Sequence, residues 1–183
     1  MSRLTYITDE QASQTAAASF DGIRQKIGMV PNLYRIMANE PAVLSANLAM
    51  NEALSSGSFS AATREAIALA AAGANSCDYC ASAHTAISRG LKVGQDEIDR
   101  RLEGRSSDAK LDSILKFAVA VIAERGFVGS AQIDAARAAG LTDGEIIETV
   151  GNVIANIFTN YVNHVAETDI DFPVVRAGAQ QAA

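Results

Sequence analysis

Cysteine, histidine and proline are scarce in this chain, and tryptophan is missing altogether. The 183 residues hold two cysteines, two histidines and three prolines. Two cysteines exclude a disulfide-rich scaffold, and a chain of this length buries on the order of 70% of its unfolded surface without disulfides or metal. Little proline and much alanine favour helices throughout, because proline breaks helices and alanine is the best helix former.

Basic residues are also few compared with acidic ones. Lysine and arginine together number 15 against 21 aspartates and glutamates, which gives a formal net charge of -6. No block of basic residues appears, whereas binding to nucleic acid or to an anionic membrane surface calls for a basic patch. We therefore expect no nucleic acid and no membrane as a partner.

Long apolar runs are absent as well. No stretch reaches the roughly 18–20 apolar residues that a membrane span requires. The N-terminal sequence MSRLTYITDEQASQ lacks the apolar segment of a signal peptide. We expect a cytoplasmic protein with a single domain over residues 1–183, since one hydrophobic core typically serves ~100–200 residues.

Helix caps, and not alternating strand patterns, divide the chain. We expect a first helix with Thr8 as its N-cap and Gly28 at its end, followed by helices that start at Pro31 and Pro41. Ser60 fits the N-cap of the next helix. The predicted fold class is therefore an all-α, single-domain helical bundle.

The second half of the chain continues the same pattern. Asn75 or Ser76 fits the N-cap of the helix CDYCASAHTAISRG, and further helices follow in KVGQDEIDRRLEG, SSDAKLDSILKFAVAVIAERG and GSAQIDAARAAG. Thr142 with Glu145 fits a capping box at the start of the last helix. We predict a loose tail after Val175.

Both cysteines and one histidine fall in the segment NSCDYCASAH, residues 75–84. On a helix Cys77 and Cys80 are about 60° apart and His84 lies one turn beyond Cys80, so the three share a face. Cys77 is expected in the first turn, where the helix dipole favours a thiolate, the reactive form. Cys80 can close a disulfide with it, and His84 can take or give a proton.

Glu65 precedes this motif by one helix and a turn. If that turn folds the two helices back antiparallel, the Glu65 carboxylate reaches the Cys/His face, and a buried carboxylate there can exchange protons with His84. A first-turn glutamate that only complements the helix dipole stays open as the alternative. The same nineteen-residue spacing recurs between Glu145 and His164, but that second copy has no cysteines.

Two further interpretations of the motif stay open. The cysteines can be small buried hydrophobes, with His84 an ordinary residue of the helix surface. A zinc-stabilised oligomeric binding protein is another alternative function, with Cys77, Cys80 and His84 as zinc ligands and Glu65 as the fourth. Because one helix spreads ligands along its axis and no second Cys/His pair exists, we predict no metal site. No haem or flavin motif is visible, so we predict no cofactor.

The segment REAIALAAAGANSCDYCASAHTAISRG contains a glutamate, eleven residues, C-x-x-C, three residues and a histidine. It resembles the alkylhydroperoxidase D and carboxymuconolactone decarboxylase-like superfamily, in its peroxidase-related branch. PNLYRIMANEPAVL and NYVNHVAETDIDFP extend the resemblance to roughly residues 20–175. The resemblance implies an all-helical fold that assembles into trimers or hexamers. It also implies a thiol-dependent peroxidase that acts on a hydroperoxide substrate and is regenerated by an external dithiol reductant.

The resemblance also implies roles for single residues. Cys80 attacks the peroxide, and Cys77 resolves the resulting sulfenic acid as an intramolecular disulfide. Glu65 and His84 form the proton relay that activates Cys80.

One departure from the family pattern concerns the residues between the cysteines. The well-studied alkylhydroperoxidase has a histidine there that supports turnover, whereas this chain has Asp78 and Tyr79. A redox-sensing or disulfide-exchange module with little peroxidase turnover is therefore the alternative function. The decarboxylase branch lacks the cysteine pair, so we do not expect lactone decarboxylation.

Composition predicts association between copies of the chain. Hydrophobic residues make up 49% of the sequence, and the segment GNVIANIFTNYV is apolar around most of its circumference. Such a helix is buried on more than one side, in the core or against another subunit. We expect a homo-oligomer with a largely apolar interface.

Overall fold

The computed structural model describes residues 2–178, which contain nine α-helices and no β-strand. The predicted all-α, single-domain class is confirmed. Within these residues no helix combines the length and the hydropathy of a bilayer-spanning segment. The helices are α1 (Gln14–Ile27), α2 (Asn32–Met37), α3 (Pro41–Ser55), α4 (Ala61–Ala74), α5 (Asp78–Gly90), α6 (Gln95–Leu102), α7 (Ala109–Ala123), α8 (Ser130–Ala138) and α9 (Asp143–Ala166).

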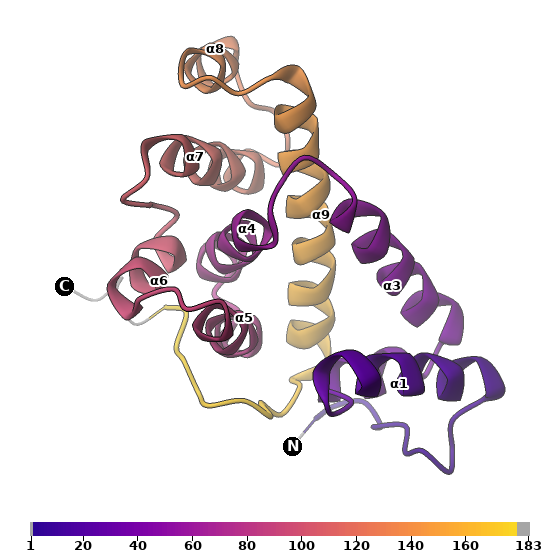
Figure 1. The fold of residues 1–183 in the computed structure, drawn as a ribbon. Coiled ribbons are helices and arrows are strands. Elements are labelled where there is room, and N and C mark those ends of the chain that lie inside the picture. Colours follow the sequence, from indigo (N-terminus) through magenta and orange to yellow (C-terminus); the bar gives the residue numbers. More distant parts are fainter. Residues whose placement is uncertain (1, 179–183) are drawn as a thin grey trace.

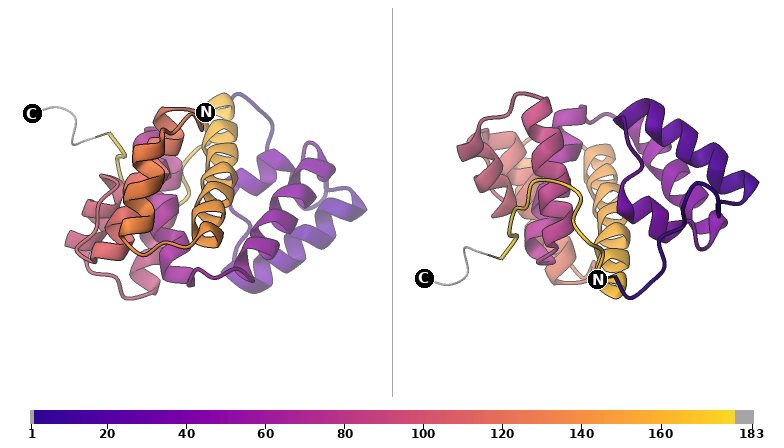
Figure 2. Two further views of the ribbon diagram at one scale, coloured as in Figure 1. Left: turned by 90° about the horizontal axis from the view of Figure 1, so that it is seen from above. Right: turned by 90° about the horizontal axis from the view of Figure 1, so that it is seen from below.

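The long helix α9 runs between two groups of helices (Figure 1). Helices α1, α2 and α3 lie on one side of it, and α4, α5, α6 and α7 lie on the other. Figure 2 shows the same division from above and from below. Because α9 contacts α2, α3, α4, α5 and α7, side chains from both groups meet along it.

Helix α4 lies at the centre of the second group and is buried on nearly all sides. Residues 66–72, with the sequence AIALAAA, are all buried. Alanine side chains keep the helix thin, so α5, α6, α7 and α9 all pack directly against it. Glu65, one residue before this stretch, stands at the edge of the core and is partly exposed.

Most of the predicted helix starts are confirmed. Pro31 is the N-cap of α2, and Pro41 occupies the first turn of α3, where its missing N–H costs nothing. The Ser60 side chain accepts a hydrogen bond from the backbone N–H of Thr63. Thr142 and Glu145 form the predicted capping box of α9.

The predicted start of the first helix at Thr8 is wrong. The N-cap is Ser13, whose hydroxyl accepts the backbone N–H of Ala16. The backbone N–H of Thr8 instead donates to the side chain of Gln11, which closes a separate turn. The predicted end is confirmed, since Gly28 takes the left-handed conformation with φ 86°.

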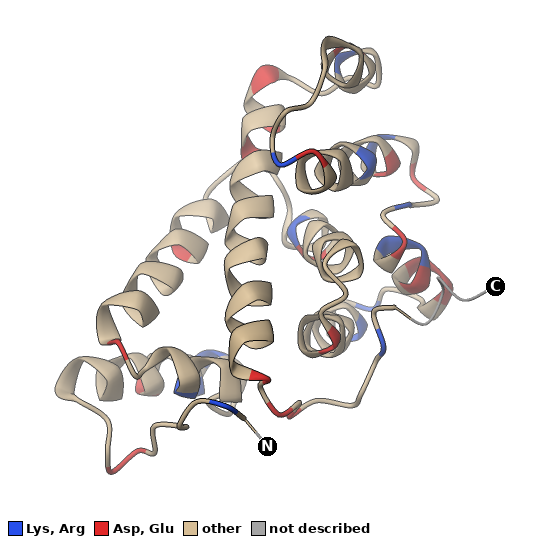
Figure 3. Ribbon diagram, turned by 180° about the vertical axis from the view of Figure 1, so that it is seen from behind, with Lys and Arg blue, Asp and Glu red and all other residues tan. Residues whose placement is uncertain are grey.

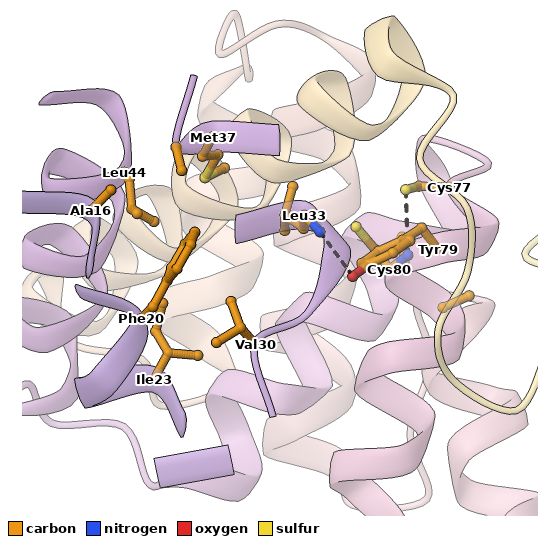
Figure 4. Packing of buried hydrophobic residues seen from close by; sticks show 13 residues of the cluster. Ala16, Phe20, Ile23, Val30, Leu33, Met37, Leu44, Cys77, Tyr79 and Cys80 are labelled. Carbon is orange, nitrogen blue, oxygen red and sulfur yellow. Dashed lines mark hydrogen bonds between the residues drawn. The ribbon is translucent and has the colours of Figure 1, made fainter. Parts of the chain in front are cut away.

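The predicted cap of α5 at Asn75 or Ser76 is also wrong. Asn75 is the C-cap of α4, and Ser76 turns the chain with a left-handed φ of 54°. Because Ser76 is the one residue between the two caps, the N-cap position of α5 falls to Cys77. Its sulfur accepts the backbone N–H of Cys80 at 3.5 Å (Figure 4).

The segment after α9 returns across α5, as the view from below in Figure 2 shows. The Ser82 hydroxyl accepts the backbone N–H of Val175 at 2.9 Å, and Asp78 accepts hydrogen bonds from Arg176 and from the backbone of Ala177. The prediction of a loose tail after Val175 is therefore wrong for Arg176 and Ala177, and its part beyond residue 178 lies outside the described residues.

Candidate active site

The turn at Ser76 folds α5 back along α4, as the sequence analysis required for Glu65 to matter. Glu65 Oε2 lies 2.7 Å from His84 Nδ1, and each side chain is about one-fifth exposed, at 20% and 21%. The structure therefore pairs the two residues, so neither a glutamate that serves the helix dipole alone nor an isolated surface histidine describes them. Because His84 Nδ1 is hydrogen-bonded to Glu65, Nε2 is the ring nitrogen that can exchange a proton with a bound molecule.

The carboxylate of Glu65 controls the charge of His84. Burial opposes the charged imidazolium, but the charge of Glu65 and its hydrogen bond outweigh this and raise the pKa of His84. The resulting positive charge then helps to stabilise a thiolate at Cys80.

The two cysteines differ in acidity in the order opposite to the one that the helix dipole suggests. The Cys77 thiol donates to the sulfur of Cys80, which lowers the pKa of Cys80 and raises that of Cys77. Burial opposes the lowering at Cys80, while His84, Asn160 and Asn163 add to it. We expected Cys77 in the first turn of α5, but Cys77 is the N-cap before that turn.

Cys80, His84 and Glu65 line one cavity of about 480 Å³ between the two groups of helices. The Tyr79 hydroxyl accepts the backbone N–H of Leu33 at 3.2 Å (Figure 4), and the Phe172 ring meets the Tyr79 ring edge-on at 5.9 Å. The wall is largely apolar, with contributions from Ile27, Pro31, Leu33, Tyr34, Tyr79, Ala83, Ile87, Ala155 and Phe172.

Cys77 lines a different cavity, of about 440 Å³, together with His164 and Arg176. The two cysteines therefore line separate cavities, and Tyr79 borders both. His164 has no partner glutamate at the nineteen-residue spacing, because Glu145 and His164 lie on the single helix α9, about 28 Å apart along its axis. The repeated spacing does not mark a second site.

The four residues of the zinc alternative do not form one ligand set. Among residues 2–178, no three His, Cys, Asp or Glu side chains converge with the spacing that a metal ion needs. Glu65 and His84 instead form one pair and the two thiols form another.

Sequence analysis missed the asparagines that approach Cys80 from α9. Asn163 Nδ2 donates to Cys80 Sγ at 3.3 Å, and Asn160 also lowers the pKa of Cys80. The signal was present in the sequence, since Asn152, Asn156, Asn160 and Asn163 recur at helical spacing in a segment we described as apolar.

Residues 41–109, which contain Glu65 and the whole cysteine and histidine motif, match the Carboxymuconolactone decarboxylase family. The fold matches the alkylhydroperoxidase AhpD core of an uncharacterized peroxidase-related protein from Ralstonia eutropha JMP134. That TM-score is 0.84 at 23% identity, over 93% of this chain and 92% of that one. Over residues 41–109 the chain is therefore similar to the Carboxymuconolactone decarboxylase family, and its fold is that of the alkylhydroperoxidase AhpD core.

Other solved structures share this fold. An uncharacterized peroxidase-related protein from Silicibacter sp. TM1040 is 25% identical, with a TM-score of 0.76 over 90% of this chain and 86% of that one. The debrominase Bmp8 is 20% identical, with a TM-score of 0.78 over 92% of each chain. A cysteine-to-alanine variant of Bmp8 has been solved with 2,3,4-tribromopyrrole. No curated protein matches the chain in sequence.

Proposed function

We propose that the protein is a thiol-dependent antioxidant peroxidase that reduces hydroperoxides with Cys77 and Cys80. The position of Cys80 carries this proposal. Cys80 is only 2% exposed, it lines a cavity shared with the Glu65–His84 pair, and the pKa of its thiol is held below the ordinary thiol range. Two structures of the same fold bear the description peroxidase-related, which supports the proposal.

The chemistry begins at Cys80. Its thiolate attacks the distal oxygen of the peroxide, the S–O bond forms as the O–O bond breaks, and the leaving alkoxide or hydroxide takes a proton from His84. The sulfur is oxidised to a sulfenic acid while the peroxide is reduced to an alcohol or water. Glu65 keeps His84 charged for this proton transfer.

Cys77 completes the cycle. Its sulfur attacks the sulfenic acid of Cys80, water leaves, and an intramolecular disulfide forms. As the N-cap of α5, Cys77 is less constrained than a residue inside the helix, although local rearrangement is still needed for an S–S bond of ~2.05 Å. An external dithiol then returns two electrons, and the separate cavity beside Cys77 supports its entry from that side.

The walls of the cavity favour organic hydroperoxides over very polar ones. A further groove of about 530 Å³ between α1 and α3 shares Lys26, Ile27, Tyr34 and Asn51 with the cavity. An apolar substrate tail can therefore extend from Cys80 into this groove.

A single-turnover titration tests the proposal. Mixing the reduced protein with one equivalent of cumene hydroperoxide should consume two thiols and yield a Cys77–Cys80 disulfide in peptide maps. Cys80→Ser should abolish the reaction, whereas Cys77→Ser should still react once and retain a sulfenic acid that dimedone traps. Intermolecular bridges alone, or unreacted thiols, would contradict the proposal.

Disulfide exchange without peroxide chemistry is the second candidate, favoured by Tyr79 in place of a histidine and by the open cavity at Cys77. Such a module equilibrates with dithiols and disulfides but leaves hydroperoxides intact. Peroxide consumption under excess dithiothreitol therefore separates the two functions. The metal content of protein purified without chelator tests the zinc alternative.

A further inference from the structure

Helix α9 presents a row of asparagines to the interior of the molecule. Asn152, Asn160 and Asn163 are buried, and Asn156 lines the cavity of Cys80. The amides of Asn152 and Asn156 are bonded to backbone carbonyls one turn earlier in the same helix. Asn160 and Asn163 make no such bond, so their amides are available to other elements.

Asn163 directs its amide at the sulfur of Cys80. The residue is 4% exposed, and its Nδ2 donates to Cys80 Sγ at 3.3 Å. Its Oδ1 is buried with no hydrogen-bond partner among the described residues. Burying an amide with one unsatisfied atom destabilises the fold. A charge-assisted hydrogen bond from Asn163 Nδ2 to an anionic sulfur is a functional reason for keeping the amide there.

Asn160 is held in one orientation by the turn between α4 and α5. Its Oδ1 accepts a hydrogen bond from Asn75 Nδ2 at 2.8 Å, which leaves Nδ2 as its remaining hydrogen-bonding group. This Nδ2 is buried and has no hydrogen bond of ordinary geometry within residues 2–178. The same side chain also contributes to the lowered pKa of Cys80.

We propose that Asn160 and Asn163 form a two-amide anion site that stabilises the Cys80 thiolate and the oxygen it receives from peroxide, with Asn75 as the residue that positions Asn160. The oxygen-binding part rests on the peroxidase function proposed above, and the thiolate part does not. When the peroxide oxygen is transferred, the sulfenate carries negative charge on oxygen, and the unpaired Nδ2 of Asn160 becomes its donor.

Asn160 and Asn163 differ from the thiols, the tyrosines, Glu65 and His84 in being unable to titrate. The titratable side chains of Tyr34, Glu65, Tyr79 and His84 line the cavity together with Cys80, and Cys77 stands at the cap before α5. Each of these gains or loses a proton within some pH range, whereas an amide donor acts equally at every pH. The contribution of the amides is therefore separable from that of the Glu65–His84 pair.

The thiol pKa of Cys80 tests the anion site without any peroxide. We would measure it from the pH dependence of iodoacetamide alkylation in a Cys77→Ser background, where Cys80 is the single thiol. Asn163→Leu removes the donor at nearly constant volume and should raise this pKa by about one to two pH units. Asn163→Asp should raise it further, because a carboxylate repels the thiolate. Asn152→Leu, a buried asparagine of the same row, is the matched control and should leave it unchanged.

The thiol pKa of Cys80 in an Asn75→Ala variant is a second test. Asn75 is partly exposed, so this substitution is not expected to unfold the protein. Removing the partner of Asn160 Oδ1 frees that amide to rotate, so the thiol pKa should rise by less than in Asn163→Leu. An unchanged thiol pKa in both Asn163→Asp and Asn75→Ala would overturn the proposal. Raised values in a protein that never reacts with peroxide would refute the peroxidase and leave the anion site standing.

Discussion

At the scale of single residues, the proposed peroxide reduction depends on two opposite charges in one cavity, a thiolate at Cys80 and an imidazolium at His84. The pKa of Cys80 is lowered, chiefly by the Cys77 thiol, and the pKa of His84 is raised by Glu65 against the effect of burial. Between these two values the thiolate and the imidazolium coexist, so the nucleophile and the proton donor are both in their active forms. The rate of peroxide reaction should rise with pH through the pKa of Cys80 and fall through that of His84.

We predict that removing Glu65 moves both limbs of this pH profile, because His84 loses its charge more easily and Cys80 then loses the support of a charged His84. The rising limb should shift to higher pH and the falling limb to lower pH. Glu65→Gln lowers the pKa of His84, so the fall should begin at a lower pH. His84→Ala should lose on the order of 10²–10⁴-fold in rate, and the double variant should lose little more, because the two residues act as one unit. Stopped-flow mixing with cumene hydroperoxide from pH 5 to pH 9 measures both limbs.

Glu103→Gln is the control for the loss of one negative charge, since Glu103 is exposed at the end of α6 and borders neither sulfur's cavity. Its profile should match that of the wild type. Equal rates in the wild type, Glu65→Gln and His84→Ala, with unchanged helicity, would mean that the pair has no role in the reaction.

At the scale of helices, a single glycine allows α4 to pack against the end of α6. A Cβ atom added at Gly73 would lie 1.9 Å from the backbone oxygen of Leu102, the last residue of α6. The backbone of Leu102 cannot move aside as a flexible side chain can. Helices α4 and α6 must therefore separate if Gly73 is replaced by a residue with a Cβ atom. The same end of α4 carries Asn75 and the turn that brings Cys77 into place.

We predict that Gly73→Ala lowers the free energy of unfolding by at least the roughly 1–3 kcal/mol typical of an overpacked core. Gly22→Ala is the matched control, because Gly22 lies within α1 with no atom within 4 Å of an added Cβ. It should raise stability by about 0.5–1 kcal/mol, the gain expected from alanine in a helix. Urea unfolding followed by circular dichroism measures both, and a neutral Gly73→Ala would show that α6 is not tightly held.

At the scale of the whole molecule, α9 has an outer face that the described chain leaves uncovered. Ile147, Ile154, Tyr161 and Val165 recur at seven- and four-residue intervals and are between 49% and 70% exposed. No charged residue lies between Glu148 and Glu167, and Figure 3 shows the middle turns of α9 free of acidic and basic colour. We propose that this stripe is the interface of the expected homo-oligomer, because a row of large apolar side chains along one helix is suited to association.

We predict that Ile154→Glu or Tyr161→Glu converts an oligomer, a trimer or hexamer, into a 19.1 kDa monomer. A carboxylate in an apolar interface is desolvated without a partner, which opposes association. Phe127→Glu is the control, since Phe127 is 86% exposed but lies between α7 and α8, away from the stripe. Light scattering at micromolar concentration gives the mass, and a wild-type monomer would refute the interface.

The helices and most of their boundaries could be predicted from the sequence because their causes are local. Pro31, Pro41 and Ser60 mark helix starts by the chemistry of one or two neighbouring residues, and the structure keeps all three. The errors at Thr8 and at Asn75 and Ser76 arose where several residues able to cap a helix stand within a few positions. There the path of the neighbouring turn selected the cap, and a local pattern does not contain that path.

The sequence by itself determined the fold class and the spacing that places Cys77, Cys80 and His84 on one helix face, since both follow from the geometry of a helix. Tertiary structure alone decided which thiol is acidic. The acidity of Cys80 depends on the Cys77 thiol at the cap, on His84 charged through Glu65, and on amides from α9 about 80 residues further along the chain. Electrostatic stabilisation acts through space over a few ångströms, so it is set by the groups that folding brings together and not by those adjacent in sequence.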